Sequence, residues 1–370
     1  MLARGFRRFE RGGKFGDHAA KLVRFSNVGV GGVIVAGKRN FSRAAQGGDG
    51  FAIRLRPACG ERQLLFFVLL HLRISEGVFA LIIFAILLAI GDVRDGGDRL
   101  ENLEKMINAV EETQKRGLNR AEHRLHLRCE LPHHTTLPLF EKLVGREPVS
   151  LVSLMDHSPG QRQFANIEKY REYYQGKYSL NDAEMARYEE EQLALAAQWS
   201  QPNRLRIAAM CRDRNIALAS HDDATHDHVR ESHQLGSVIA EFPTTFEAAE
   251  ASRQHGMNVL MGAPNIVRGG SHSGNVAASK LASLGLLDIL SSDYYPASLL
   301  DAAFRVADDE ENRFTLPQAI RLVTKNPAAA LNLQDRGEIA ERKRADLVLA
   351  HRKGEHIHID HVWRQGKRVF

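Results

Sequence analysis

The sequence predicts an α/β protein built on a parallel sheet, and three observations support this prediction. From residue 98 onward, short apolar runs alternate with helical segments, which is the pattern of βαβ units. Residues suited to chemistry recur where the predicted strands end, and parallel α/β folds place their sites there. With 370 residues, 44% hydrophobic and 26% charged, the chain suits a globular protein of one large or two domains.

The first clear elements are a helix, two strands and a second, longer helix. Asp98 caps the first helix, whose leucine, isoleucine and valine residues fall at helical spacing and which stops at Gly117. In the next element apolar Leu125, Leu127 and Cys129 alternate with polar residues, which is the period of a strand. The predicted ranges are the helix 98–117, the strands 124–130 and 149–155, and a long polar helix over about 181–214.

The second half continues the alternation of strands and helices. Thr244 and Glu247 have the spacing of a capping box, which predicts a helix that ends at Gly256. The other ranges are strands at 216–220, 237–242, 258–261 and 289–292, helices at 225–235 and 316–325, and short strands over the last 35 residues. This pattern fits both a (β/α)₈ barrel and a doubly wound sheet.

Four residues that could bind a metal stand at or just after the ends of four strands: Glu130, His157, His221 and Asp293. Carboxylates and imidazoles are ligands of Zn²⁺, Mn²⁺ and Mg²⁺, and a charged group at the end of an apolar strand needs a partner. Two alternatives stay open on the residues alone. In the first, Glu130 pairs instead with Arg128 or His133; in the second, His157 serves only a hydrogen-bonded turn.

Two further segments carry candidate residues. Residues 221–228 hold three histidines, of which His226 and His228 fall inside a predicted helix and are expected to be solvated, while Asp222 or Asp223 is a candidate helix cap. The Gly-rich segment 263–275 offers hydrogen-bond donors and a fixed positive charge for an anion, and its alternative is a flexible surface loop. The anion-binding candidates there are Arg268, Gly269, Gly270 and His272.

The balance of basic and acidic residues changes near residue 89. Residues 1–88 hold 14 basic and 5 acidic residues, a balance of +9, whereas residues 89–370 hold 36 and 40, a balance of −4. Because no nucleic-acid-binding motif accompanies the basic segment, we expect no nucleic-acid partner. The first quarter therefore needs a separate interpretation.

The sequence disfavours a membrane-spanning protein and a disulfide-stabilised protein. The apolar stretch 64–90 is interrupted by His71, Arg73 and Glu76, which leaves runs of 7 and 13 residues, and a membrane span needs about 20. The three cysteines are isolated and odd in number, so neither a disulfide framework nor a thiolate zinc site is indicated. We expect a cytoplasmic protein.

The residues resemble a known family. The C-terminal pattern Thr324-x-Asn326-Pro327-Ala328-x-x-Leu331, followed by Ala345-Asp346-Leu347-Val348, resembles the signature of the amidohydrolase superfamily. More narrowly, residues 89–370 resemble the diphosphatases of the bacterial carbon–phosphorus lyase pathway. The runs that carry this resemblance are HLRCELPHHTTLPLFEKLV, SLMDHSPGQRQFAN, ASHDDATHDHV, GAPNIVRGGSHSGNVAAS and SSDYYPASLLDAAFR.

This resemblance implies a metal-dependent (β/α)₈ barrel over residues 89–333, with residues 334–370 supplying strands of a small β-sandwich. It implies hydrolysis of α-D-ribose 1-methylphosphonate 5-triphosphate to the 5-phosphate with release of pyrophosphate. A divalent ion, Zn, Mn or Mg, is the implied cofactor, with Glu130, His157 and His221 as ligands. Asp293 is the implied further ligand and general base. Arg268, Gly269, Gly270 and His272 are expected to hold the polyphosphate of a small-molecule substrate.

Residues 1–88 depart from the family pattern. The superfamily ends its first barrel strand with a His-x-His or His-x-Asp metal pair, and His18 and His71 belong to no such pair. We consider two origins for this atypical basic segment, a frame-shifted or aberrant N-terminus and a divergent native one. The alternatives for the whole chain are an impaired homologue that acts at most as a binding protein, and an amidohydrolase that acts on a C–N bond. A homo-oligomer is also compatible with the sequence.

Overall fold

The structure, a computed structural model, describes residues 84–90, 98–271, 274–354 and 356–370. The chain divides into two compact units, and all of these residues belong to the unit made of Gly29–Gly37 and Arg54–Phe370. Of the N-terminal segment 1–88, the structure describes only the residues from Phe84 onward, so the predictions for residues 1–83 fall outside the described residues.

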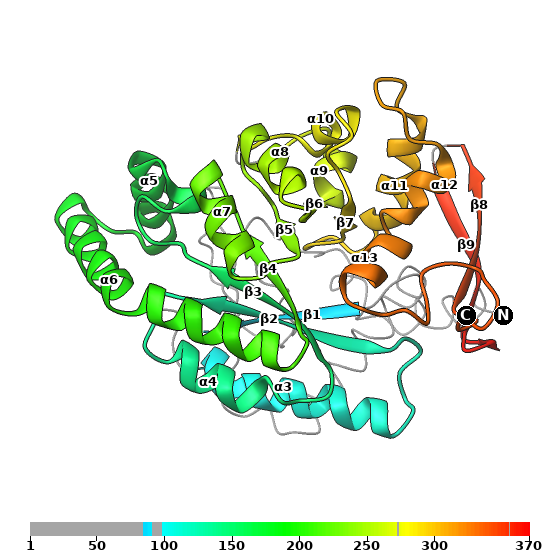
Figure 1. Cartoon of the computed structure of the whole chain (residues 1–370), viewed down its shortest axis with the longest axis horizontal. Helices are drawn as coiled ribbons and strands as arrows, with labels where there is room; N and C mark the ends of the chain where they lie inside the picture. The colour runs from blue at the N-terminus through cyan, green and yellow to red at the C-terminus, as the bar shows by residue number, and fades with distance from the viewer. Residues whose placement is uncertain (1–83, 91–97, 272–273, 355) are drawn as a thin grey trace, which may run out of the picture. The chain divides into compact units, whose positions relative to one another are not determined.

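Seven parallel strands of the described residues form one sheet, in which each strand pairs with the next one along the chain (Figure 1). They are β1 (Phe84–Ile90), β2 (His123–Glu130), β3 (Val149–Met155), β4 (Ala217–His221), β5 (Ile239–Glu241), β6 (Asn258–Gly262) and β7 (Ile289–Ser291). A doubly wound sheet reverses its strand order at a switch point, and this sheet has no reversal. The order is that of a (β/α)₈ barrel, so the parallel α/β prediction is confirmed and the alternative topology is excluded.

Helices connect the strands, and a small antiparallel sheet ends the chain. The helices are α3 (Asp98–Lys115), α4 (Thr136–Leu143), η2 (Arg162–Phe164), α5 (Ile167–Tyr178), α6 (Asp182–Asp213), α7 (His226–Gln234), α8 (Phe246–Gln254), α9 (Ala263–Arg268), α10 (Ala278–Ser283), α11 (Ser298–Asp308), α12 (Leu316–Arg321) and α13 (Lys325–Ala330). The second sheet contains β8 (Leu347–Lys353), β9 (His356–Arg364) and β10 (Lys367–Arg368) in the order β10-β9-β8. The short C-terminal strands are therefore confirmed, while the domain boundary at residue 333 stays a prediction.

Three local predictions are wrong. The cap of α8 is Thr245, whose hydroxyl accepts from the Ala248 amide, because the backbone of Thr244 is tied to two other loops through Asp223 and Val276. The Gly-rich segment starts as a helix, α9, since Pro264 at its start favours the helical backbone.

The predicted helix 316–325 is two helices. The first ends at Arg321, and Thr324, the residue before the second, has a non-helical backbone, with φ −131° and ψ −82°. Asn326 then donates a 2.8 Å hydrogen bond to the carbonyl of Asp288 and ties α13 to the start of β7. Pro327 lies in the first turn of α13, where a missing N–H costs no helical hydrogen bond.

Strands β2 to β7 are buried on both faces. On the outer face Leu125, Leu127 and Cys129 of β2 pack with Phe140 of α4 and Ile207 of α6. The inner face carries a second apolar layer, made of Leu151, Ala217, Ala219, Ile239, Leu260 and Ile289. Two positions further along β3, β4 and β5, the inward side is instead polar, with Ser153, His221 and Glu241. The interior therefore changes from apolar to charged toward the carboxyl ends of the strands.

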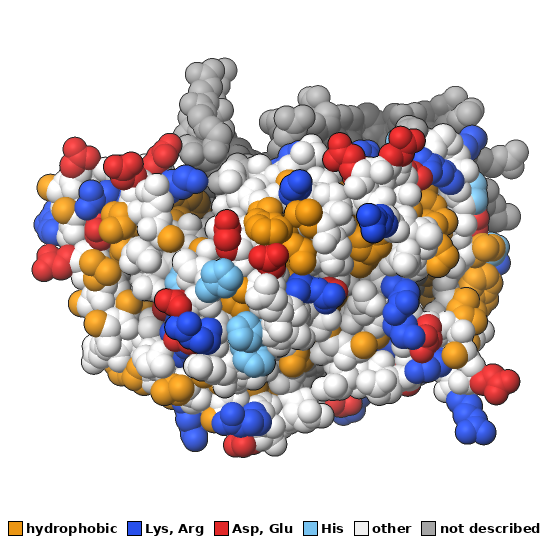
Figure 2. Space-filling model, turned by 45° about the horizontal axis from the view of Figure 1, so that its top comes forward, with side chains coloured by type: hydrophobic (Ala, Val, Ile, Leu, Met, Phe, Trp, Pro, Cys, Tyr) orange, Lys and Arg blue, Asp and Glu red, His pale blue; other side chains and the backbone are white. Residues whose placement is uncertain are grey.

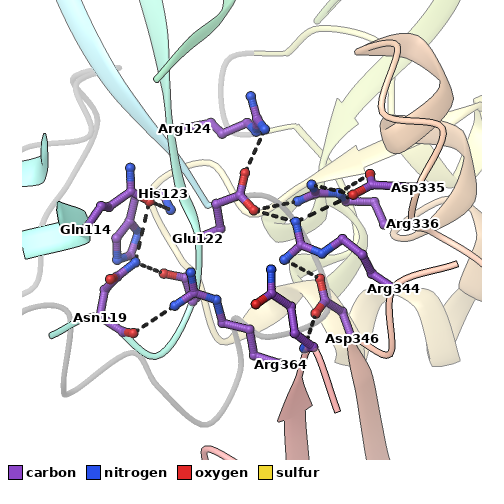
Figure 3. A network of polar contacts seen from close by, with 12 residues as sticks. Gln114, Asn119, Glu122, His123, Arg124, Asp335, Arg336, Arg344, Asp346 and Arg364 are labelled. Atoms are coloured by element: carbon purple, nitrogen blue, oxygen red, sulfur yellow. Dashed lines mark hydrogen bonds and ion pairs between the residues drawn. The ribbon is translucent and has the colours of Figure 1, made fainter. Parts of the chain in front are cut away.

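Glu122, just before β2, ties the barrel to the C-terminal segment (Figure 3). Its carboxylate accepts from Arg124 at 2.7 Å, from Arg344 at 2.6 Å and from Arg336 at 3.1 Å. Burial alone would raise the pKa of Glu122, but the three arginines lower it to about 2. Asp346, which precedes β8, pairs with Arg344 at 3.0 Å, so the cluster continues to the small sheet.

The surface and the helices bear on two expectations about partners. On the face drawn in Figure 2, basic and acidic side chains are interspersed and do not gather into one basic area. That face lacks the continuous positive surface that follows a nucleic-acid backbone, and the expectation of no nucleic-acid partner stays a prediction. Among the described residues, none of the helices combines the length and apolar composition that a bilayer crossing requires.

Replacing Glu122 with Gln should lower the free energy of unfolding at neutral pH by about 1–3 kcal/mol, between the values for exposed and buried ion pairs. The folded pKa lies below the unfolded one, so the ionised carboxylate stabilises the fold above about pH 4.5, and this contribution is lost as the pH falls toward 2. Urea unfolding across this pH range is the measurement, and the gap between wild type and variant should narrow on acidification. Glu112→Gln, which removes an exposed pair with Arg116, is the control and should change little.

Candidate metal site at the carboxyl ends of the strands

The four predicted strand-end residues lie at the same end of the sheet. Glu130 and His221 are the last residues of β2 and β4, while His157 and Asp293 each follow their strand by two residues. Parallel strands in sequential order bring these ends together, which is the physical basis of the prediction. The contacts below describe which of them meet.

His157 lies between two carboxylates. Its Nδ1 is 2.6 Å from Oε2 of Glu130, and its backbone N–H donates to Oε1 of the same residue at 3.0 Å. Its Nε2 is 3.8 Å from Oδ2 of Asp222. Burial alone would lower the pKa of His157, but Glu130 and Asp222 raise it to about 10. Glu130 thus pairs with His157, and neither Arg128 nor His133 takes the place of that partner.

A buried relay of polar groups fixes the ring of His221. Its Nδ1 is 2.8 Å from Oε2 of Glu241, which also accepts from the hydroxyl of Ser153 at 2.8 Å. On the other side, Arg128 Nη2 lies 2.8 Å from His221 Nε2. Because arginine only donates, Nε2 must accept, and the imidazole proton resides on Nδ1 and is donated to Glu241. The lone pair on Nε2 therefore points at the guanidinium of Arg128.

The relay extends to His126, whose Nε2 is 2.5 Å from the hydroxyl of Ser153. Burial lowers the pKa of His126 to about 4, with Arg128 and His221 acting in the same direction against Glu241. The pKa of Glu241 is lowered well below its usual range, because His126, His221 and Arg128 together outweigh its burial. A neutral His126 and an ionised Glu241 follow at neutral pH.

Asp293 and Asp222 share an unusual backbone. Asp293 lies two residues beyond β7 and Asp222 directly follows β4, and both have a positive φ, at 47° and 56°, a conformation that asparagine and aspartate tolerate better than most residues. Burial raises the pKa of Asp293, Arg128 and His221 lower it, and Glu241 and Asp222 add to the increase, with the net shift upward. Gly262, the last residue of β6, has no side chain, and a Cβ atom at this position would lie 3.7 Å from Oδ2 of Asp293. The end of β6 therefore also borders this carboxylate.

These donors fit a divalent metal ion. One ligand atom each from His157, His221 and Asp222 lies within 4.8 Å of the others. Nδ1 of His221 donates to a carboxylate, the usual arrangement around a zinc-binding histidine, and Nε2 is the atom that would bind the metal in place of its hydrogen bond from Arg128. Nitrogen and carboxylate donors suit Zn²⁺ or Mn²⁺.

Three of the predicted phosphate-binding residues lie at the end of α9 and just beyond it. Arg268 ends α9, and Gly269, with φ 86°, follows as its left-handed cap. α9 starts directly after Gly262, so Arg268 lies about 8 Å further along the helix axis. Gly270 comes next, and His272 lies outside the described residues.

Sequence reasoning missed Arg128, Asp222 and Glu241 as members of the site. Glu241 ends β5, so the rule that selected the other strand ends also applied to it. Neither Asp222 nor Asp223 caps α7, since the hydroxyl of Thr225 accepts from the helix instead. His226 and His228 do lie in α7 as predicted.

A comparison with known proteins identifies the family. The model of the amidohydrolase family matches residues 100–370. The chain belongs to the amidohydrolase family. A relative from Escherichia coli (strain K12), named alpha-D-ribose 1-methylphosphonate 5-triphosphate diphosphatase, is 89% identical over 282 residues, which are 76% of this chain and 75% of that protein.

Solved structures show weaker likenesses. Guanine deaminase from C. acetobutylicum has a TM-score of 0.43 and 9% identity, over 84% of this chain and 78% of its own. An amidohydrolase from Thermotoga maritima MSB8 has a TM-score of 0.37 and 18% identity, over 67% and 62%. At these TM-scores and identities, the solved structures do not indicate the function of this member of the amidohydrolase family.

Replacing Glu241 with Gln should weaken divalent-metal binding about 10- to 100-fold, the range for partners of metal-bound histidines. The amide would offer His221 Nδ1 a donor or a weaker acceptor in place of a carboxylate. Affinity for Zn²⁺ and Mn²⁺ can be measured by competition with a chromophoric chelator. Glu247→Gln, at an exposed position of α8, is the matched control and should bind like wild type. Equal affinities for all three proteins would contradict the role of Glu241.

Proposed function

We propose that this amidohydrolase hydrolyses α-D-ribose 1-methylphosphonate 5-triphosphate to the 5-phosphate and releases pyrophosphate. The observation that carries the proposal is the 89% identity to the diphosphatase of that name, over three quarters of its length. The cluster of carboxylates and imidazoles at the strand ends supports it, since a metal-assisted hydrolysis needs ligands and a base in one place.

In the proposed site, His157, His221 and Asp222 hold a divalent ion, with Glu130 and Asp293 as further carboxylate ligands beside them. Such an ion, when bound, polarises a phosphoryl oxygen and makes water more acidic. Glu241 keeps Nδ1 of His221 protonated and leaves the lone pair on Nε2, so that the ion would replace Arg128 as the partner of this atom. The identity of the ion, Zn, Mn or Mg, is part of the proposal.

Asp293 is the proposed general base. In hydrolysis, the water oxygen forms a bond to phosphorus while the bridge between the first and second phosphates breaks, and the water proton passes to a carboxylate oxygen of Asp293. Burial raises the pKa of Asp293, which increases its basicity toward that proton. Arg128, which lowers the pKa of Asp293, keeps the carboxylate ionised before the proton arrives.

The charge of the site explains why the substrate needs further cations. Four carboxylates, those of Glu130, Asp222, Glu241 and Asp293, lie at the strand ends, and an unscreened triphosphate would be repelled by them. In the proposal, the Arg268 guanidinium binds the polyphosphate, with Gly269, Gly270 and His272 beside it. The backbone N–H groups of Gly269 and Gly270 donate to the carbonyls of Ile266 and Asn265 in α9, so they would bind phosphate only by giving up these bonds. Arginine suits this role because its planar fork matches phosphate oxygens.

Asp293→Asn should lower kcat by about 10²- to 10⁴-fold, because the amide cannot accept the proton. The assay is pyrophosphate release from the triphosphate by the full chain with added Zn²⁺, Mn²⁺ or Mg²⁺. The control is Asp227→Asn, since the Asp227 side chain is 77% exposed on α7, and it should leave kcat unchanged.

Two results would overturn the proposal. Full turnover by the Asp293→Asn variant would remove the general base. A wild-type chain that binds metal yet releases no pyrophosphate would favour the impaired homologue, and hydrolysis of an amide by that chain would favour the C–N amidohydrolase.

A further inference from the structure

A group of five charged side chains lies beside the candidate metal site, and neither the metal nor the substrate proposal uses it. We name it the buried charge cluster, and its members are Asp156, Arg162, Arg204, Asp223 and Glu231. Four of them are buried, and the Glu231 side chain is 35% exposed. Three carboxylates face two guanidinium groups, so each arginine is shared.

Glu231 on α7 joins the two arginines. Its Oε1 accepts from Arg204 Nη1 at 2.7 Å, and its Oε2 accepts from Arg162 Nη2 at 2.9 Å. Arg204, from α6, also pairs with Asp156 at 3.1 Å, and Arg162 forms an ion pair with Asp223. The contacts therefore form one continuous chain, with Glu231 in the middle and an aspartate at each end.

Both terminal aspartates are sequence neighbours of candidate ligands. Asp156 directly precedes His157, and Asp223 directly follows Asp222. His157 and Asp222 belong to the loops after β3 and β4, and their Nε2 and Oδ2 atoms are 3.8 Å apart. The cluster thus connects the loop after β3 to the loop after β4 through the residues next to the candidate ligands.

The backbone beside the cluster is constrained. Arg162 has a φ of 44° and Asp222 a φ of 56°. A positive φ is unfavourable for arginine and persists where the surroundings hold the residue in place, a feature that concentrates at functional sites. Buried ion pairs often add little stability compared with apolar packing, so stability alone is a poor explanation for five charges here.

We propose that Glu231 is a positioning residue for metal binding, which fixes the distance between His157 and Asp222 by holding Arg162 and Arg204 together. The inference rests on the metal site of the proposed function. Glu231 touches no candidate ligand in the contacts above and acts through the two arginines and their aspartates. Without the Glu231 carboxylate, the loop after β3 is no longer tied to the loop after β4, while each loop keeps its own candidate ligand.

The test is the affinity of the full chain for Zn²⁺ and Mn²⁺, by chelator competition, in the Glu231→Gln variant. Gln keeps the shape but loses the charge that two arginines share, and affinity should fall about 10-fold, the lower end of the range for residues that orient ligands. Glu189→Gln is the matched control, because it removes an α6 carboxylate whose partner is Arg171 of α5. The control should retain wild-type affinity.

A second variant keeps the inference testable if Glu231→Gln folds poorly. Arg204→Lys keeps the positive charge but cannot bond Asp156 and Glu231 with two separate N–H groups of a rigid fork, and it should also weaken metal binding. Thermal unfolding of each variant separates the roles, because a merely structural role lowers the melting temperature and leaves metal affinity unchanged.

Wild-type affinity in folded Glu231→Gln and Arg204→Lys proteins would overturn the inference and leave the proposed function in place. A wild-type chain that binds no divalent ion would overturn the metal site, and the inference with it. Weaker metal binding in both variants, with the control unchanged, would support it.

Discussion

The structure depends on how charged groups are accommodated inside the carboxyl end of a parallel sheet. Such groups cannot be buried without partners, because an isolated charge loses several kcal/mol of hydration. Here the two histidines have such partners: His157 lies between Glu130 and Asp222, and His221 lies between Glu241 and Arg128. The partners that make burial tolerable are also those that orient the ligand atoms.

This arrangement separates two functions along each strand. The inner apolar layer, which includes Ile239 and Leu260, stabilises the sheet through packing. The next inward positions carry the polar relay, where Glu241 and Ser153 orient His221. A chemical site can therefore vary at the strand ends while the apolar layer below continues to hold the fold, which is a general property of parallel barrels.

Long helices and distant ion pairs hold the loops that carry the site. On α6, Asn203 donates to the carbonyls of Leu131 and His133 after β2, and its neighbour Arg204 reaches Asp156 after β3. At the amino end of β2, Glu122 joins the start of the strand to Arg344 in the C-terminal segment. These contacts span many residues of sequence, so the positions of the loops depend on the complete fold.

The sequence by itself determined the elements and the end of the sheet where chemistry occurs. Local signals suffice for both, because periodicity and strand ends are properties of adjacent residues, as β3 shows, whose range is the predicted 149–155. Only the tertiary structure decided the partners. The pairing of Glu130 with His157, the tautomer of His221 set by Arg128, and the role of Glu241 join residues 20 to 93 positions apart. No local pattern encodes such contacts, since they arise only when sequential parallel strands bring their carboxyl ends to one place.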